Sequence, residues 1–156
     1  MWLGAYFETW ASKWVSSGGM SDLAAITDFN VVYLAFVIPS TTYLAGQMTF
    51  ANTGLQFSWD FAEVAKAIKV LQSRNVQVLL AVGGASYPFD GNFNPKSIAA
   101  LAKDLGCNGV DIDWEPSGGA SRATEFGPII SKLRGYLPRP WPVSYTHLTL
   151  PTNREV

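Results

Sequence analysis

The segment spanning residues 108–115 constrains this chain most, because its side chains alternate between two kinds. The apolar set is Val110, Ile112 and Trp114, and the acidic set is Asp111, Asp113 and Glu115. Successive side chains of a β-strand point to opposite faces of the sheet. The pattern therefore predicts a strand over residues 109–114 with the acids on one face. Like charges in a row repel each other, so this face indicates a functional site rather than a solvent-facing edge strand.

Four strand-then-helix units can be followed along the chain. Apolar runs predict strands at residues 3–7, 31–37, 76–82 and 109–114, and helical periodicity predicts helices near 20–26, 59–73, 95–105 and 120–137. Ser58 and Asn94 are the expected N-caps of the second and third helices, and Pro138 follows the fourth. Alternating strands and helices predict a parallel sheet with right-handed crossovers. The fold class is therefore α/β, an incomplete (βα)8 or TIM barrel of about the first four βα units.

The connection between the second strand and the second helix, residues 38–56, is longer than usual. Connecting segments of barrels and related folds often carry binding residues. We therefore expect residues 38–56 to form part of the substrate cleft.

Composition excludes several classes of protein. The chain has 156 residues, 48% hydrophobic and 15% charged, which is typical of one globular domain rather than a disordered segment. A net charge of −1 predicts neither a nucleic-acid partner nor an anionic membrane surface. A run of 18 apolar residues is lacking, so no membrane span is expected. Cys107 is the single cysteine, which rules out an internal disulfide and indicates a core position.

The C-terminal residues stand apart from this pattern. Residues 143–152 resemble the conceptual translation of a sequencing-library adapter over ten consecutive positions. We therefore expect residues 1–142 to form the domain and residues 143–156 to be a non-native tail outside the fold, including the strand-like stretch 148–150. The tail holds His147, the only histidine, so the domain lacks the histidine of a Ser-His-Asp triad or of a histidine zinc site.

The acidic octet resembles the D-G-x-D-x-D-x-E motif of glycoside hydrolase family 18, the chitinases and their relatives. Gly109 and the three acids fall in register with it, and Asn108 stands where the family usually has Asp. Residue 108 is furthest from the carboxyl end of the strand, so we expect it not to touch substrate, and Asn keeps hydrogen-bonding capacity. Residues 81–84 resemble the S-x-G-G motif that ends the family's third strand, with Ala81 replacing Ser. The resemblance covers about residues 1–142 and implies an N-terminal fragment of such a barrel.

This resemblance implies hydrolysis of β-1,4 N-acetylglucosamine linkages in chitin or chitooligosaccharides by a substrate-assisted, retaining mechanism. Glu115 would be the general acid and later the general base, Asp113 would hydrogen-bond the acetamide N–H, and Asp111 would share a proton with Asp113. No cofactor and no metal is implied. Because the three acids are retained, the parent protein is expected to be an enzyme. Family members complete the sugar pocket with a Tyr and a Trp from later strands, so this fragment is expected to be inactive. The candidate substrate-binding residues are Tyr6, Phe7, Trp10, Gly83, Gly84 and Tyr87.

Other functions stay open. The family includes chitin-binding lectins and inhibitors that have lost the acid, and endo-β-N-acetylglucosaminidases that use the same motif on N-glycans. A different class would be a metal-dependent hydrolase in which Asp111 and Asp113 bind Mg²⁺ or Ca²⁺. The expected partner is chitin or another N-acetylglucosamine-containing oligosaccharide, with no nucleic acid and no membrane. The resemblance places the parent protein outside the cell, although no signal peptide precedes the first strand.

Overall fold

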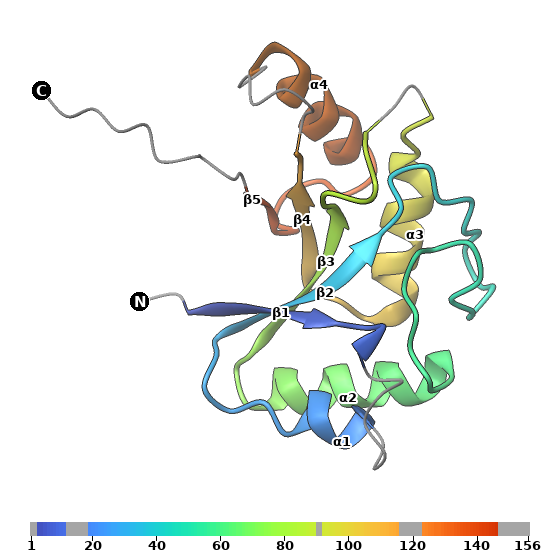
Figure 1. Cartoon of the computed structure of the whole chain (residues 1–156). Coiled ribbons are helices and arrows are strands. Elements are labelled where there is room, and N and C mark those ends of the chain that lie inside the picture. The colour runs from blue at the N-terminus through green and yellow to red at the C-terminus, as the bar shows by residue number, and fades with distance from the viewer. Residues whose placement is uncertain (1–2, 12–18, 90–91, 116–122, 147–156) are drawn as a thin grey trace, which may run out of the picture.

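The computed structural model describes residues 3–11, 19–89, 92–115 and 123–146, which form one parallel sheet with flanking helices (Figure 1). The strands are β1 (Gly4–Glu8), β2 (Val31–Val37), β3 (Gln77–Gly83), β4 (Gly109–Asp113) and β5 (Val143–Thr146), paired in sequence order. The helices are α1 (Gly19–Ala24), α2 (Phe61–Ser73), α3 (Pro95–Leu105) and α4 (Ala123–Arg134). Within these ranges, no helix is long and apolar enough to cross a membrane.

The predicted α/β class, an incomplete (βα)8 barrel, is confirmed by this arrangement. Every neighbouring pair of strands is parallel, and a helix follows each of the first four strands, as in the opening units of a barrel. The second strand and the third helix match the expected residues. The other elements differ from the prediction by a few residues at their ends, and residues 120–122 of the fourth predicted helix lie outside the described residues.

The N-cap predicted for α2 is wrong. The helix begins at Phe61, and the carboxylate of Asp60, not the hydroxyl of Ser58, accepts a hydrogen bond from the Glu63 amide at 2.9 Å. Both residue types are good caps, so the choice depends on where the buried helix face begins, which is at Phe61. The prediction for α3 is confirmed, because the Asn94 side chain accepts from the Ser97 amide at 3.2 Å.

Strand β5 departs from the expectation that residues 143–156 stay outside the fold. Val143–Thr146 pairs in parallel with β4, with Val110 opposite Val143 and Asp111 opposite Ser144. Strand pairing uses backbone groups, so a short segment rich in Val, Tyr and Thr can occupy a free sheet edge whatever its origin. The adapter-derived origin of residues 143–156 therefore stays a prediction, and residues 147–156 lie outside the described residues.

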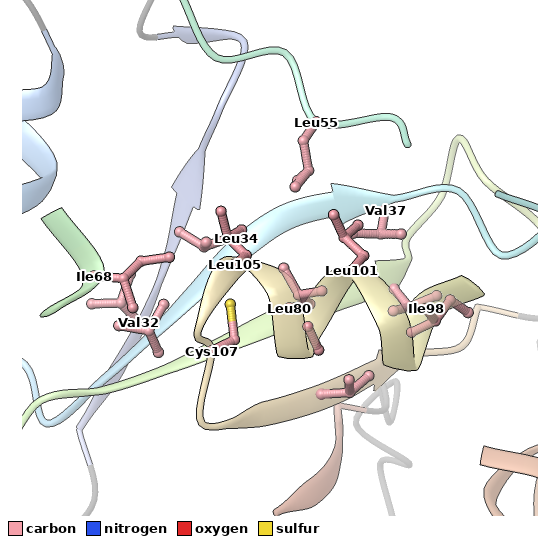
Figure 2. Close-up of a cluster of buried hydrophobic side chains, with 14 of the residues drawn as sticks. Val32, Leu34, Val37, Leu55, Ile68, Leu80, Ile98, Leu101, Leu105 and Cys107 are labelled. Carbon is pink, nitrogen blue, oxygen red and sulfur yellow. The ribbon is translucent and has the colours of Figure 1, made fainter. Parts of the chain in front are cut away.

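The hydrophobic core lies between the sheet and its helices. Side chains from β2 and β3 pack against those of α3, and Cys107 is buried among them, as predicted from the sequence (Figure 2). The core side chains drawn and labelled there are Val32, Leu34, Val37, Leu55, Ile68, Leu80, Ile98, Leu101, Leu105 and Cys107. We call this side of the sheet the helix face and the opposite side the inner face.

The long connection 38–56 is anchored to the core by buried side chains. Tyr43 is buried, its ring stacks on Phe61 of α2, and its hydroxyl donates to the Asp104 carboxylate at 2.8 Å. Burial, then the hydrogen bond to Asp104, raises the pKa of Tyr43 to about 12. Leu55 joins the same core (Figure 2). These contacts are with the core and α3, and the contribution of this connection to a substrate cleft stays a prediction.

Candidate active site

The predicted alternation of β4 is present in the structure. Asp111 and Asp113 lie opposite Ala81 and Gly83 of β3 in the parallel register, so these positions share the inner face. Asp111 is 0% exposed and Asp113 is 5% exposed, and Glu115 is half-buried just beyond the end of the strand. Residues 116–122, which follow Glu115, lie outside the described residues.

The apolar side chains of β4 occupy the other face. Val110 and Ile112 are fully buried in the core, and Trp114 packs against Phe126 of α4 with ring centroids 5.9 Å apart. This burial gives the strand one permissible register, because a shift by one residue would place three acids in the core. The core thus determines which face of β4 carries the carboxylates.

Asp113 is an acid whose surroundings raise its pKa. Burial, then the negative charge of Glu115, then that of Asp111, raises the pKa of Asp113 to about 6. Its Oδ1 atom is buried and has no hydrogen-bond partner among the described residues. An unsatisfied buried polar atom costs free energy, and such groups are rare in native proteins unless a ligand or a reaction uses them. Asp113 therefore has a buried oxygen whose hydrogen-bonding capacity the described residues do not use.

Asp111 lies deeper in the sheet. The Ser144 hydroxyl of β5 donates to its Oδ1 atom at 2.5 Å. Ser144 belongs to the segment predicted to be a non-native tail. We therefore do not propose Ser144 as a residue of the native site. The pKa of Tyr33 is raised by burial and then by the negative charge of Asp111, which places the tyrosine within electrostatic reach of the acid.

The two glycines predicted as substrate contacts, Gly83 and Gly84, lie close to atoms of neighbouring strands. Gly83 and Gly84 have φ of +107° and +81°. A Cβ on Gly83 would collide with the Asp113 carbonyl oxygen, and one on Gly84 would lie 3.2 Å from the Phe36 ring. The two glycines therefore allow neighbouring strands to approach closely, and contact of either glycine with substrate stays a prediction.

The aromatic candidates at the first strand divide between the two faces. Tyr6 pairs in register with Tyr33, so it shares the inner face with the acids, and its ring lies 5.1 Å from that of Tyr33. Phe7 points the other way and stacks on Phe57 at 6.1 Å. The structure therefore does not bring Phe7 to the acidic face. The reason is the strand period, since two adjacent side chains cannot share one face.

Phe36 is an inner-face aromatic residue that the sequence did not single out. Its ring lies 5.5 Å from that of Tyr6 and 6.1 Å from that of Trp10. The register of β2 against β3 shifts between Leu34 and Val37, which turns residue 36 toward the inner face. No sequence signal marks this shift, because residues 31–37 are a continuous apolar run. The inner-face aromatic cluster thus comprises Tyr6, Trp10, Tyr33 and Phe36.

Tyr87 lies after β3 in the turn that Gly84 begins. Its amide donates to the Gly84 carbonyl at 3.1 Å, and its side chain is half-buried. The turn leaves β3 at the residue paired with Asp113, so Tyr87 lies near the carboxyl end of β4. Only the backbone of Tyr87 is placed by these contacts, and contact of the Tyr87 ring with sugar stays a prediction.

The described ranges hold no group of three His, Cys, Asp or Glu side chains arranged to bind a metal ion. Two cavities of about 400 and 320 Å³ share Pro140, Trp141 and Pro142 in their walls. They border Asn108 and Val143, at the amino ends of β4 and β5, whereas Glu115 lies at the opposite end of β4. The candidate site is therefore the inner face at the carboxyl ends of the strands.

Comparison with known proteins shows that the chain is similar to chitinases and to a chitinase-like agglutinin. A chitinase from Plasmodium falciparum (isolate 3D7) is 27% identical over 150 residues, covering 85% of this chain and 38% of the relative. The chain also resembles the solved structure of a putative chitinase A from Streptomyces coelicolor, with a TM-score of 0.65 at 16% identity over 92% of this chain and 48% of the other. A chitinase-like agglutinin from Robinia pseudoacacia matches with a TM-score of 0.58 at 20% identity, over 92% and 46% of the two chains.

The chain thus spans about two fifths of the curated relative and about half of each of these two solved structures. The model of the family described as Glycosyl hydrolases family 18 matches residues 3–140, which include all three acids and both glycines of the site and end before β5 begins. On this match over most of its length, the chain belongs to glycosyl hydrolases family 18.

Proposed function

We propose that the parent protein hydrolyses β-1,4 linkages between N-acetylglucosamine units of chitin or chitooligosaccharides. The observation that carries the proposal is the buried Oδ1 atom of Asp113, which has no partner among the described residues and lies within electrostatic reach of Asp111 and Glu115. An acid with a raised pKa and a free oxygen suits a substrate that brings its own hydrogen-bond donor. The acetamide N–H of N-acetylglucosamine is such a donor.

Glu115 is proposed as the general acid because it is half-buried at the end of the strand, where it can meet both protein and substrate. The acetamide carbonyl oxygen of the substrate attacks the anomeric carbon while Glu115 gives its proton to the leaving glycosidic oxygen. Water then attacks the same carbon, and Glu115 takes a proton from it. The ring opens back to the acetamide, and the configuration at the anomeric carbon is retained.

Asp113 is proposed to hold the acetamide group during this reaction. Its free oxygen accepts from the acetamide N–H, which directs the acetamide carbonyl oxygen toward the anomeric carbon. The positive charge that develops on the cyclised acetamide lies beside Asp111 and Asp113, and their negative charge stabilises it. Asp111 is fully buried, so its proposed role is to supply negative charge to the site rather than to touch the sugar.

The activity belongs to the longer parent protein, since this chain covers about half of the solved structures it resembles. The family resemblance places a Tyr and a Trp of the sugar pocket on later strands, so we expect the isolated chain to be inactive. The proposed enzyme is therefore tested in a complete barrel that contains residues 3–140 as its first half.

The test is Glu115→Gln in that complete enzyme, assayed on chitin oligosaccharides. We expect turnover to fall by a factor of at least about 10²–10⁴, the usual contribution of a general acid, while oligosaccharide affinity is kept. Glu63→Gln is a matched control because the Glu63 carboxylate lies on the surface of α2, where it pairs with Lys66 at 2.6 Å. Unchanged turnover in Glu115→Gln would contradict the proposal.

A non-catalytic sugar-binding protein is the second candidate, favoured by the likeness to the Robinia agglutinin and by the inner-face aromatic cluster. The same assay separates the two, since a lectin binds chitin oligosaccharides without hydrolysing them even with Glu115 intact. Hydrolysis of N-glycans but not of chitin oligosaccharides would instead identify an endo-β-N-acetylglucosaminidase. Loss of activity in EDTA would support metal-dependent hydrolysis.

A further inference from the structure

We propose that Gly83 and Gly84 are positioning residues that hold the end of β4, and with it Asp113, through the backbone rather than by touching the sugar. The inference rests on the proposed function only in giving Asp113 a role there, and it deepens that function by naming what positions this acid.

The two glycines turn the chain sharply at the end of β3. Gly83 is the last residue of the strand, and both it and Gly84 have positive φ. Residues other than glycine rarely adopt positive φ, and two in succession would be strained with any side chain. The Tyr87 amide then donates to the Gly84 carbonyl at 3.1 Å, which continues the turn. The chain is thereby directed across the end of β4.

Both glycines contact the carbonyl oxygen of Asp113. The Gly84 amide donates a hydrogen bond to that oxygen at 2.8 Å. A Cβ on Gly83 would collide with the same oxygen, so only glycine permits this approach. On the other side, Gly84 packs against Phe36 of β2 closely enough that an added Cβ would lie 3.2 Å from its ring. The two glycines therefore join the ends of β2, β3 and β4.

Asp113 is the last residue of β4, so its carbonyl group marks the point where the chain leaves the sheet toward Glu115. Fixing this carbonyl fixes the backbone from which the Asp113 side chain projects. The carboxyl group then stays buried, with its free oxygen on the inner face. The charged and titratable groups around it are Asp111 and Glu115 on the same chain segment, and Tyr33 of β2 near Asp111.

Release of this contact has a measurable consequence. If the end of β4 moves away from the glycines, the Asp113 carboxyl gains water and moves relative to Glu115 and Asp111. Burial and the two neighbouring charges are what raise the pKa of Asp113 to about 6. The pKa should therefore fall toward the ordinary aspartate value when the contact is broken. A purely structural role elsewhere in the fold would not change this titration.

The test is Gly83→Ala in the full chain, compared with Gly106→Ala. A Cβ at position 83 would collide with the Asp113 carbonyl oxygen, so the end of β4 has to move. Gly106 also has a positive φ, +78°, but no atom lies within 4 Å of its would-be Cβ. Both variants therefore strain the backbone, and only Gly83→Ala displaces Asp113. The pKa of Asp113 is measured by carbon NMR on the aspartate-labelled chain, with the signal assigned by its loss in Asp113→Asn.

We expect Gly83→Ala to lower the pKa of Asp113 by about one unit or more, a tenfold or larger increase in its acid dissociation constant. Gly106→Ala should leave the pKa of Asp113 at about 6. A folded Gly83→Ala chain with the wild-type Asp113 titration would overturn the proposal. A shift of equal size in both variants would also overturn it, because strain rather than contact would then be the cause.

If Gly83→Ala does not fold, the unaltered chain provides the second measurement. A scalar coupling across the hydrogen bond between the Gly84 nitrogen and the Asp113 carbonyl carbon should be detectable. Its absence, in spectra that show such couplings between β3 and β4, would overturn the proposal. Neither measurement needs substrate, so a failure here is distinct from unchanged turnover in the Glu115→Gln enzyme.

Discussion

The side-chain oxygen of Asn108 accepts a hydrogen bond from the backbone amide of Val78 at 2.8 Å. The same oxygen also accepts from the Gln72 side chain at 2.9 Å. Asn108 thus joins the end of α2, the beginning of β3 and the beginning of β4. It lies at the opposite end of β4 from Glu115, as the sequence predicted for a position that does not touch substrate.

This contact explains why Asn can stand where the family usually has Asp, and it predicts the effect of two substitutions. Asn108→Asp keeps the accepting oxygen, so we expect the free energy of unfolding to change by less than about 1 kcal/mol. Asn108→Ala leaves the Val78 amide without this partner and should lower the free energy of unfolding by about 1–3 kcal/mol. Urea unfolding of the two variants measures both values. Equal destabilisation by Asp and Ala would show that the accepting oxygen is not what matters.

The raised pKa of Asp113 predicts how stability depends on pH. In the unfolded chain the group titrates near 3.8, whereas in the folded chain it titrates at about 6. Between these values the folded state binds more protons, so its contribution to stability falls as the pH rises through this window and stays low above it. We expect a loss on the order of 1–2 kcal/mol, since one pKa unit corresponds to about 1.4 kcal/mol and water at the strand end reduces the effect.

The measurement is the free energy of unfolding at several pH values across this window, for the wild type and for Asp113→Asn. The substituted side chain does not ionise, so the variant should gain stability relative to the wild type as the pH rises. Asp28→Asn, at an exposed position outside the site, serves as the control and should keep the wild-type pH dependence. A difference between wild type and Asp113→Asn that does not vary with pH would contradict the assignment.

Much of the fold could be predicted because local signals agree with one another. The alternation in β4 places the acids and the apolar residues on opposite faces, and burial of Ile112 and Trp114 enforces that choice. Asn94 and Pro95 mark the beginning of α3 by cap chemistry alone. These features depend on residues close in sequence, so one sequence suffices to identify them.

Features that depend on pairing between distant segments could not be predicted in this way. Alternation requires that Tyr6 and Phe7 face opposite sides, but only the register against β2 shows that Tyr6 is the inner one. Phe36 reaches the inner face through a register shift inside an apolar run, which leaves no mark in the sequence. The path of residues 38–56 depends on Tyr43 meeting Asp104, a contact between residues 61 positions apart.

The division of the first-strand aromatics predicts different losses for Trp10 and Phe7. Trp10 belongs to the inner-face aromatic cluster, so Trp10→Ala in the complete parent protein should weaken the proposed chitin-oligosaccharide binding roughly tenfold, or about 1.4 kcal/mol. Phe7→Ala removes a ring that packs against the core, so it should lower the free energy of unfolding by about 3 kcal/mol. Calorimetric titration with oligosaccharide and urea unfolding of both variants separate the two roles. Weaker binding in a stable Phe7→Ala protein would place Phe7 in the sugar site.

The proposed non-native origin of residues 143–156 predicts that the fold does not depend on them. Among the described residues, Leu137 is the last fully buried core residue along the chain. The Pro142 carbonyl, which accepts a hydrogen bond from the Val110 amide at 3.1 Å, also lies before β5. A chain ending at Pro142 should therefore keep cooperative unfolding and the helical signal in circular dichroism. Loss of cooperative unfolding on this truncation would show that β5 is an integral strand.

Sequencing of the source DNA across the Pro142 codon tests the same hypothesis from the other side. We expect the reading frame to continue beyond Pro142 into further strand–helix units, with a Tyr and a Trp at strand ends that complete the sugar pocket beside Asp113. DNA that encodes residues 143–156 and then a stop codon would make the adapter hypothesis wrong. The Ser144 hydroxyl would then be a native partner of Asp111, and a half barrel with a fifth strand would favour binding over catalysis.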